Sequence, residues 1–176
     1  MKILGLALWG LGNHAIKRML PAINSVKEIS LVGVCSRNER KVKECAKNWN
    51  CYGWTDSDKM LSNPNIDVVY IATPIGVHFN LAIQALKAGK HVWCEKPLTC
   101  NYKETEALIR YATENKKMIT EAFMYLYHSQ FNKVKRFVDD KKTGQIHSVI
   151  CRFGIPNLKD PGFRINPRLG GGALWD

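Results

Sequence analysis

Leu4-Gly5-Leu6-Ala7-Leu8-Trp9-Gly10-Leu11-Gly12-Asn13-His14-Ala15 is the stretch that decides the fold. It carries an apolar strand, predicted over residues 2–9, directly into the pattern G-x-G-x-x-A. Gly10 permits a tight turn, Gly12 lets the backbone approach a pyrophosphate, and Ala15 lets the next helix pack closely. The first N–H groups of that helix then face the phosphates. We therefore take Gly10, Leu11, Gly12, Asn13 and Ala15 as candidate cofactor-binding residues, the alternative being a plain glycine-rich turn.

Beyond this turn, the apolar pattern alternates between the period of a strand and that of a helix. Strands are predicted over residues 29–35, 66–72, 91–94 and 118–122, and helices over residues 12–20, 39–48, 76–88 and 102–115, with a helical turn at 57–62. The first helix is expected to end near Pro21, and Asn38 and Asn101 are expected to cap two later ones. Such alternation is typical of an α/β fold with a doubly wound parallel sheet. We therefore predict a dinucleotide-binding Rossmann domain over residues 1–122.

After residue 122 the pattern changes, and it predicts the start of a second, incomplete α/β domain over residues 123–176. A helix is expected at 129–140, a turn at 143–145 and a long alternating strand at 146–153. We expect the partners of that strand to be mostly missing, and an open strand edge pairs readily with another chain. This predicts a homo-oligomer formed through the C-terminal sheet.

Charge and composition narrow the classes of function. The chain of 176 residues carries 26 Lys and Arg against 15 Asp and Glu, a net charge of +11. The basic residues are spread along predicted helices and no nucleic-acid motif is legible, so a nucleic-acid binder is the least favoured interpretation. No run of about 18 apolar residues occurs, which argues against a membrane span. We expect neither nucleic acid nor a membrane as a partner.

Six cysteines are scattered through the chain. None stands in a C-x-x-C pair or in another spacing typical of zinc sites, so we predict no metal site. At apolar positions such residues are typical of small buried side chains in a reduced, intracellular protein. The expected location is the cytoplasm.

The end of the second predicted strand indicates the cofactor. A site for NAD(H) usually has a carboxylate there, which binds the ribose 2′-hydroxyl. This chain has Cys35-Ser36-Arg37 instead. Arg37 would pair with a 2′-phosphate, and Ser36 would add a hydrogen bond. The sequence thus predicts NADP(H) as the preferred cofactor, with NAD(H) as the alternative if Arg37 is only a solvated residue at a strand end.

Thr73 and Pro74 follow the third predicted strand, and His78 stands one turn later. Because ligands lie at the carboxyl ends of the strands in open α/β sheets, all three are candidate cofactor-binding residues. His78 is equally well explained as a residue at a helix N-terminus that has no ligand.

Glu95-Lys96-Pro97 follows the fourth predicted strand directly. Glu95 and Lys96 are placed to meet the nicotinamide end of a cofactor at the same sheet edge. Lys96 can hydrogen-bond a substrate hydroxyl or carbonyl and help to move its proton during hydride transfer. Pro97 restricts Lys96 to extended geometry and is compatible with a cis bond. The alternative for Lys96 is an ordinary surface lysine.

Taken together, these motifs resemble the glucose–fructose oxidoreductase / inositol dehydrogenase / MocA family, and most of all its dihydrodiol and D-xylose dehydrogenase branch. The matching stretches are residues 10–15, 72–74 with His78, 88–98, 121–125 and 170–176. The resemblance implies a Rossmann domain followed by an α/β domain whose large, mostly antiparallel sheet covers the nicotinamide and forms the sugar pocket. It also implies that Lys96 is a catalytic or substrate-orienting residue and that Asp176 lies at the substrate.

From this resemblance we expect an NADP(H)-dependent oxidoreductase that transfers hydride at a secondary alcohol or carbonyl of a sugar or diol. Members of the family are roughly twice as long, so we expect this chain to bind NADP(H) with little or no dehydrogenase activity. Leu126 and Ser129 stand where the branch usually has Arg and Pro, which bears on substrate binding. The alternative is a catalytically silent dinucleotide-binding remnant or interaction module.

Overall fold

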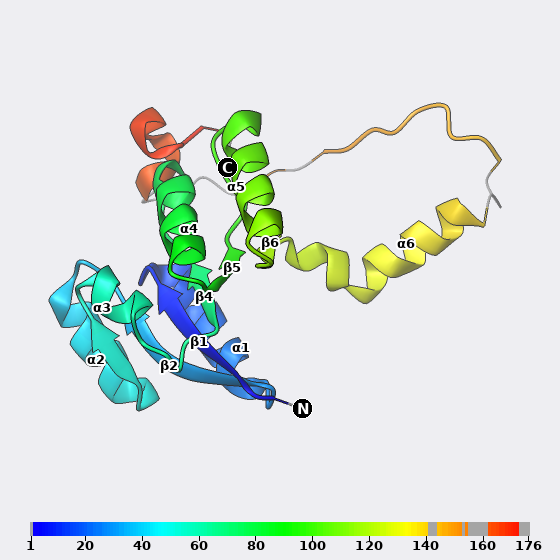
Figure 1. Cartoon of the computed structure of the whole chain (residues 1–176). Helices are drawn as coiled ribbons and strands as arrows, with labels where there is room; N and C mark the ends of the chain where they lie inside the picture. The colour runs from blue at the N-terminus through cyan, green and yellow to red at the C-terminus, as the bar shows by residue number, and fades with distance from the viewer. Residues whose placement is uncertain (1, 141–143, 153, 155–161, 173–176) are drawn as a thin grey trace. The chain divides into compact units, whose positions relative to one another are not determined.

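A six-stranded parallel sheet forms the centre of the structure, a computed structural model that describes residues 2–140, 144–152, 154 and 162–172. Figure 1 labels its strands: β1 (Leu4–Trp9), β2 (Ile29–Cys35), β3 (Tyr52–Trp54), β4 (Val68–Ile71), β5 (His91–Cys94) and β6 (Ile119–Glu121). They lie in the order β3-β2-β1-β4-β5-β6, and all neighbours are parallel. The chain therefore reverses its direction of travel across the sheet between β1 and β4, as in a doubly wound fold. The predicted fold class is confirmed.

Side chains of β1 point alternately to the two faces of the sheet. Leu6 and Leu8 pack with buried residues of α1 (Leu20–Ser25) and α2 (Glu39–Trp49). Ala7 and Trp9 pack on the other face with buried residues of α3 (Ser57–Leu61), α4 (His78–Lys87) and α5 (Tyr102–Glu114). Figure 1 shows α4 and α5 side by side. Burial on both faces explains why β1 is apolar throughout.

The helix after the glycine-rich turn runs past its predicted end. It contains a π-helical stretch, η1 (Ala15–Met19), and continues as α1 to Ser25, so the prediction of an end near Pro21 was wrong. Pro21 stands in the first turn of α1, soon after the π-helical stretch, and does not end the helix. The predicted helix at 76–88 is present as a 3-10 turn, η2 (Ile75–Val77), followed by α4.

Both predicted asparagine caps are confirmed. The side chain of Asn38 accepts a hydrogen bond from the Lys41 N–H at 3.0 Å, at the start of α2. The side chain of Asn101 accepts one from the Glu104 N–H at 3.0 Å, at the start of α5. Each cap satisfies a backbone donor that the first helical turn leaves unpaired.

The described residues fall into two compact units. One consists of residues 2–122 together with residues 163–172, and the other of the described residues between 123 and 162. In the second unit, Tyr125 of η3 (Met124–Tyr127) packs edge-on against Phe123 and against Phe131 of α6 (Ser129–Asp139). Helix α6 confirms the predicted helix at 129–140. The assignment of all of residues 123–176 to a separate domain stays a proposal.

Residues 146–152 form no strand, so the prediction of a long strand at this place was wrong for them; Phe153 lies outside the described residues. A strand needs a hydrogen-bonded neighbour to be stable in water. No strand within residues 2–140, 144–152, 154 and 162–172 pairs with this stretch. An alternating apolar pattern is therefore not sufficient here. Of the predicted turn at 143–145, Thr143 also lies outside the described residues.

Three of the six cysteines, Cys35, Cys45 and Cys94, are buried as predicted, whereas Cys151 is exposed. Burial, with a smaller effect of Asp56, raises the pKa of Cys35 to about 11. In the part of the chain that the structure describes, no three His, Cys, Asp or Glu side chains are grouped as metal ligands. None of the described helices is long and apolar enough to cross a membrane.

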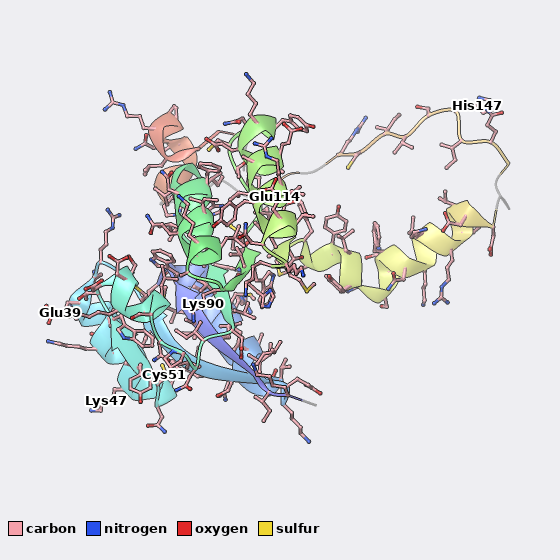
Figure 2. All side chains as sticks on the ribbon, in the orientation of Figure 1. Glu39, Lys47, Cys51, Lys90, Glu114 and His147 are labelled. Atoms are coloured by element: carbon pink, nitrogen blue, oxygen red, sulfur yellow. The ribbon has the colours of Figure 1, made fainter. Side chains whose placement is uncertain are left out.

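Two charged side chains anchor the amino ends of the central strands. Asp67, just before β4, accepts hydrogen bonds from Lys2 Nζ at 2.6 Å and from the Gly5 N–H at 2.9 Å. The Lys2 bond, then the Gly5 bond, lowers the pKa of Asp67. Lys90, labelled in Figure 2, is buried and donates to the Ile66 carbonyl at 2.9 Å.

We expect Asp67→Asn to make the protein less sensitive to acid. Because the folded-state pKa of Asp67 is lowered, its stabilising effect is present above the ordinary pKa of an aspartate and is lost as the pH falls through the folded value. The unmodified protein should therefore lose more unfolding free energy between about pH 6 and pH 3 than the variant does. Urea unfolding at both pH values measures this difference. Asp58→Asn, at an exposed position of α3, is the control. An equal loss of unfolding free energy in all three proteins would refute the stabilising role of the Asp67 carboxylate.

Candidate functional site

The turn after β1 lies at the carboxyl edge of the sheet, where the strand order reverses. Gly10 has a φ of +111°, and a Cβ atom there would lie 2.6 Å from the Ala72 carbonyl oxygen after β4. Only glycine tolerates both the positive φ and the close approach of this carbonyl. Gly12 differs, because no atom lies within 4 Å of the position its Cβ would take. One glycine thus closes the turn against β4, and the other leaves the backbone open to a ligand.

Backbone donors are unpaired at the start of the following helix. The Ile16 N–H donates to the Gly12 carbonyl at 3.0 Å. By contrast, the N–H groups of Gly12, Asn13 and His14 have no acceptor within the described chain, and no side chain caps the helix. Free N–H groups at a helix start attract anions. This arrangement fits the pyrophosphate of a dinucleotide.

The remaining residues of the turn fix its shape. Leu11 and Ala15 are 4% and 1% exposed, so they can offer a ligand their backbone but little of their side chains. The Thr73 hydroxyl is buried without a hydrogen-bond partner, and its methyl group lies next to Gly10. Buried hydroxyl groups in proteins are normally paired. Its unpaired state fits a polar ligand atom at this edge.

Three side chains gather around the end of β2 and the start of α2. The Ser36 hydroxyl accepts the Asn38 N–H at 3.3 Å, which leaves its own O–H to donate. Arg37 is exposed and makes no ion pair or hydrogen bond within the described residues. Lys41 Nζ donates to the Leu11 carbonyl at 3.2 Å and so joins α2 to the glycine-rich turn. Sequence reasoning missed Lys41, although its place one turn into a capped helix after Arg37 was a usable signal.

Glu95 is held at the same edge by two side chains that sequence reasoning did not select. The Tyr70 hydroxyl donates to Glu95 Oε1, and His14 Nε2 lies 3.3 Å from the same oxygen. Tyr70 is fully buried, and the Glu95 side chain is 15% exposed. Burial, reinforced by Glu95, raises the pKa of Tyr70 far above its usual range, so its hydroxyl stays a donor.

His78 is buried between the loops that follow β4 and β5. Its Nε2 lies 2.8 Å from the Thr73 carbonyl, and its Nδ1 lies 2.9 Å from the Pro97 carbonyl. Both ring nitrogens face the backbone, which favours the interpretation of His78 as a residue without a ligand; cofactor contact stays a prediction. Pro74 lies directly before η2 in extended geometry.

The Lys96–Pro97 bond is cis, in agreement with the sequence. Beyond it, the Leu98 N–H donates to Glu121 Oε1 at 2.7 Å. This bond ties the loop that carries Lys96 to the end of β6. Lys96 and Glu95 therefore lie at the carboxyl edge, at the end of β5.

A returning segment packs at the turn after β4. A Cβ atom at Gly76 would lie 3.0 Å from the Leu169 backbone, and one at Gly170 would lie 2.9 Å from Ile75 Cβ. The two glycines thus let η5 (Pro167–Leu169) pack directly on η2. Asp176 lies outside the described residues, so its place at the substrate stays a prediction.

A hollow of about 960 Å³ lies at the opposite, amino-terminal edge of the sheet. It is lined by residues at the starts of β1, β2 and β3 and at the end of α2, among them Lys47 and Cys51, which Figure 2 labels. Ligands of open α/β sheets bind at the other edge. We therefore place the candidate site at the glycine-rich turn, beside Glu95 and Lys96.

Comparison with known proteins shows the family of the chain. Residues 4–123 match GFO_IDH_MocA, described as an oxidoreductase family with an NAD-binding Rossmann fold. A dTDP-3,4-didehydro-2,6-dideoxy-alpha-D-glucose 3-reductase from Saccharopolyspora spinosa is 35% identical over 167 residues, which are 95% of this chain and 50% of that protein. A D-xylose 1-dehydrogenase (NADP(+)) from Haloferax volcanii is 32% identical over 95% of this chain and 51% of its own length.

A solved structure is also similar. It is a crystal structure of a 3-ketoreductase from Actinomadura kijaniata in complex with NADP and TDP-benzene. The TM-score is 0.92 at 30% identity, over 98% of this chain and 53% of the other. The chain spans about half the length of the curated relatives it matches.

Proposed function

Because the chain belongs to the GFO_IDH_MocA oxidoreductase family, we propose that it is an NADP(H)-dependent oxidoreductase for the hydroxyl or keto group of a sugar or diol. The observation that carries this proposal is the open backbone at Gly12, with unpaired N–H groups beside it. Glu95 and Lys96 lie at the same sheet edge. A dinucleotide and a substrate can therefore meet there.

The geometry supports a proposed role for several residues at this edge. The N–H groups of residues 12–14 hold the pyrophosphate. Ser36, Arg37 and Lys41 hold the adenosine 2′-phosphate, which is the group that favours NADP(H) over NAD(H). Thr73 and Glu95 belong to the nicotinamide half. When bound, the nicotinamide cofactor supplies or accepts the hydride.

Lys96 is the proposed acid and base. In the direction of reduction, its ammonium group donates a hydrogen bond to the substrate carbonyl oxygen and then gives that oxygen a proton. In the direction of oxidation, its neutral amine takes the proton of the substrate hydroxyl. Asp176 is proposed to orient the substrate, on the strength of the family resemblance alone.

The substrate is proposed to be a sugar, and a keto sugar linked to a nucleoside diphosphate is the leading class. Support comes from the similarity to a reductase of a dTDP-linked sugar and to a ketoreductase solved with TDP-benzene. The net charge of +11 also favours a polyanionic ligand. D-xylose is the second class, because the Haloferax volcanii relative is a D-xylose dehydrogenase.

The test is a fluorescence titration of the 176-residue chain with NADPH and NADH, followed by assays of NADPH oxidation and NADP reduction with both substrate classes. Saturable binding, tighter for NADPH, is the expected result. Turnover with either class would establish the enzyme, whereas binding without turnover would support the alternative of a silent dinucleotide-binding module. Failure to bind both dinucleotides would refute the proposal.

Arg37→Ala should weaken NADPH binding more than NADH binding, by about 1.5–3 kcal/mol, because a charge-assisted hydrogen bond is lost only to the 2′-phosphate. Calorimetric titration with both cofactors measures this difference. Arg40→Ala, three positions further along at an exposed position of α2, is the matched control and should leave the preference unchanged. An equal loss of affinity for both cofactors in Arg37→Ala would exclude Arg37 as the selecting residue.

A further inference from the structure

We infer that Tyr70 and His14 are positioning residues, which fix the Glu95 carboxylate so that its second oxygen accepts an N–H from the carboxamide of a bound nicotinamide. Sequence patterns pointed to Glu95 but to neither of its two holders. The inference deepens the proposed function and rests on it, since it needs a dinucleotide in the site.

Both holders act on one oxygen of the carboxylate. The Tyr70 hydroxyl donates to Oε1 of Glu95, and His14 Nε2 lies 3.3 Å from that same atom. Oε2 has no hydrogen-bond partner within the described residues. A carboxylate whose side chain is only 15% exposed, with one oxygen paired and one without a partner, is a strong acceptor for a donor group of a ligand.

Tyr70 is a rigid holder. It is fully buried in β4, and its ring centroid lies 4.6 Å from that of Trp93 on the neighbouring strand β5. Its hydroxyl stays protonated because burial and Glu95 raise its pKa. The orientation of Glu95 is therefore set by the packing of two central strands.

His14 connects the carboxylate with the phosphate end of the site. It stands at the start of the helix after the glycine-rich turn, and its side chain is 44% exposed. The open oxygen of Glu95 thus lies close to the place where the pyrophosphate would bind. Phosphate groups are repelled by a carboxylate, so the ligand group that meets Oε2 is a hydrogen-bond donor rather than a phosphate. In the adjoining nicotinamide half, the carboxamide supplies such a donor on a planar, oriented group.

The experiment compares two ligands by calorimetry: NADPH and 2′-phospho-ADP-ribose, which lacks the nicotinamide ring. Tyr70→Phe should weaken NADPH binding about tenfold, as expected when the hydrogen bond that orients a charged acceptor is lost. It should change binding of 2′-phospho-ADP-ribose by less than about twofold, because the phosphate contacts remain. Tyr111→Phe, at a partly buried tyrosine of α5 that packs against the other core cluster from Tyr70, is the matched control and should change neither value.

A second variant guards against poor folding of Tyr70→Phe. His14→Ala replaces a half-exposed side chain and should also weaken NADPH binding more than binding of 2′-phospho-ADP-ribose. Equal weakening of both ligands in the folded variants would overturn the inference, because the contact would then belong to the ribose or the phosphates. Unchanged NADPH binding would overturn it too. If the unmodified chain bound NADPH and both folded variants bound it as tightly, only the inference would fail, whereas an unmodified chain that bound neither ligand would end the proposed function as well.

Discussion

Gly12→Val is expected to weaken dinucleotide binding by about a thousandfold, or roughly 4 kcal/mol, without changing the stability of the protein. A Cβ atom at Gly12 would meet no other atom within 4 Å, so the fold leaves open space where a side chain would begin. The same empty space is where the pyrophosphate must approach the backbone. The added methyl groups would therefore exclude the ligand rather than disturb the fold.

Calorimetric titration with NADPH and urea unfolding, measured on the same preparation, test this prediction. Gly12→Ala is a graded control, since its single methyl group fills less of the space and should cost less affinity. A Gly12→Val protein that still bound NADPH as tightly as the unmodified chain would show that the dinucleotide binds elsewhere.

Gly10→Ala should have the opposite profile and destabilise the fold itself. Its φ of +111° is unfavourable for any residue with a side chain, and the new Cβ atom would lie 2.6 Å from the Ala72 carbonyl oxygen. Backbone strain and overpacking each cost about 1–3 kcal/mol, so we expect a loss of roughly 4 kcal/mol in unfolding free energy.

Gly89→Ala is the control for that measurement. Gly89 also has a positive φ, of +75°, but a Cβ atom there would approach nothing closer than Lys117 Nζ at 3.9 Å. Gly89→Ala should therefore lower the unfolding free energy only by the cost of backbone strain, about 1 kcal/mol. If urea unfolding gave equal losses for the two variants, the close approach of β1 and β4 at Gly10 would not be the cause.

The sheet could be predicted because its strands carry their own signals. Continuous apolar runs such as residues 68–72 are required wherever both faces of a strand are covered. The exception is β3, whose three residues include Gly53 and are too short to show a period. Residues 146–152 show the converse, since an alternating pattern forms no strand where no described neighbour pairs with it.

The candidate site was only partly predictable for a similar reason. Gly10, Gly12, Glu95 and Lys96 are recognisable because they lie in the loops that begin directly after β1 and β5, and the carboxyl ends of parallel strands share one edge. Tyr70 gave no such signal, because its place within an apolar strand is equally well explained by the core. Its hydroxyl acquires a role only when β4 and β5 lie side by side and bring Glu95 within reach. Contacts between distant residues of this kind depend on tertiary structure.

The most direct test of the central claim is a ¹H–¹⁵N correlation spectrum of the chain during titration with NADPH. The account predicts saturable shifts of the backbone signals of Gly12, Asn13 and His14, whose N–H groups are unpaired, together with Arg37 and Glu95. Saturable shifts confined to the hollow at the other edge, around Lys47 and Cys51, would contradict it, and so would a spectrum that NADPH leaves unchanged.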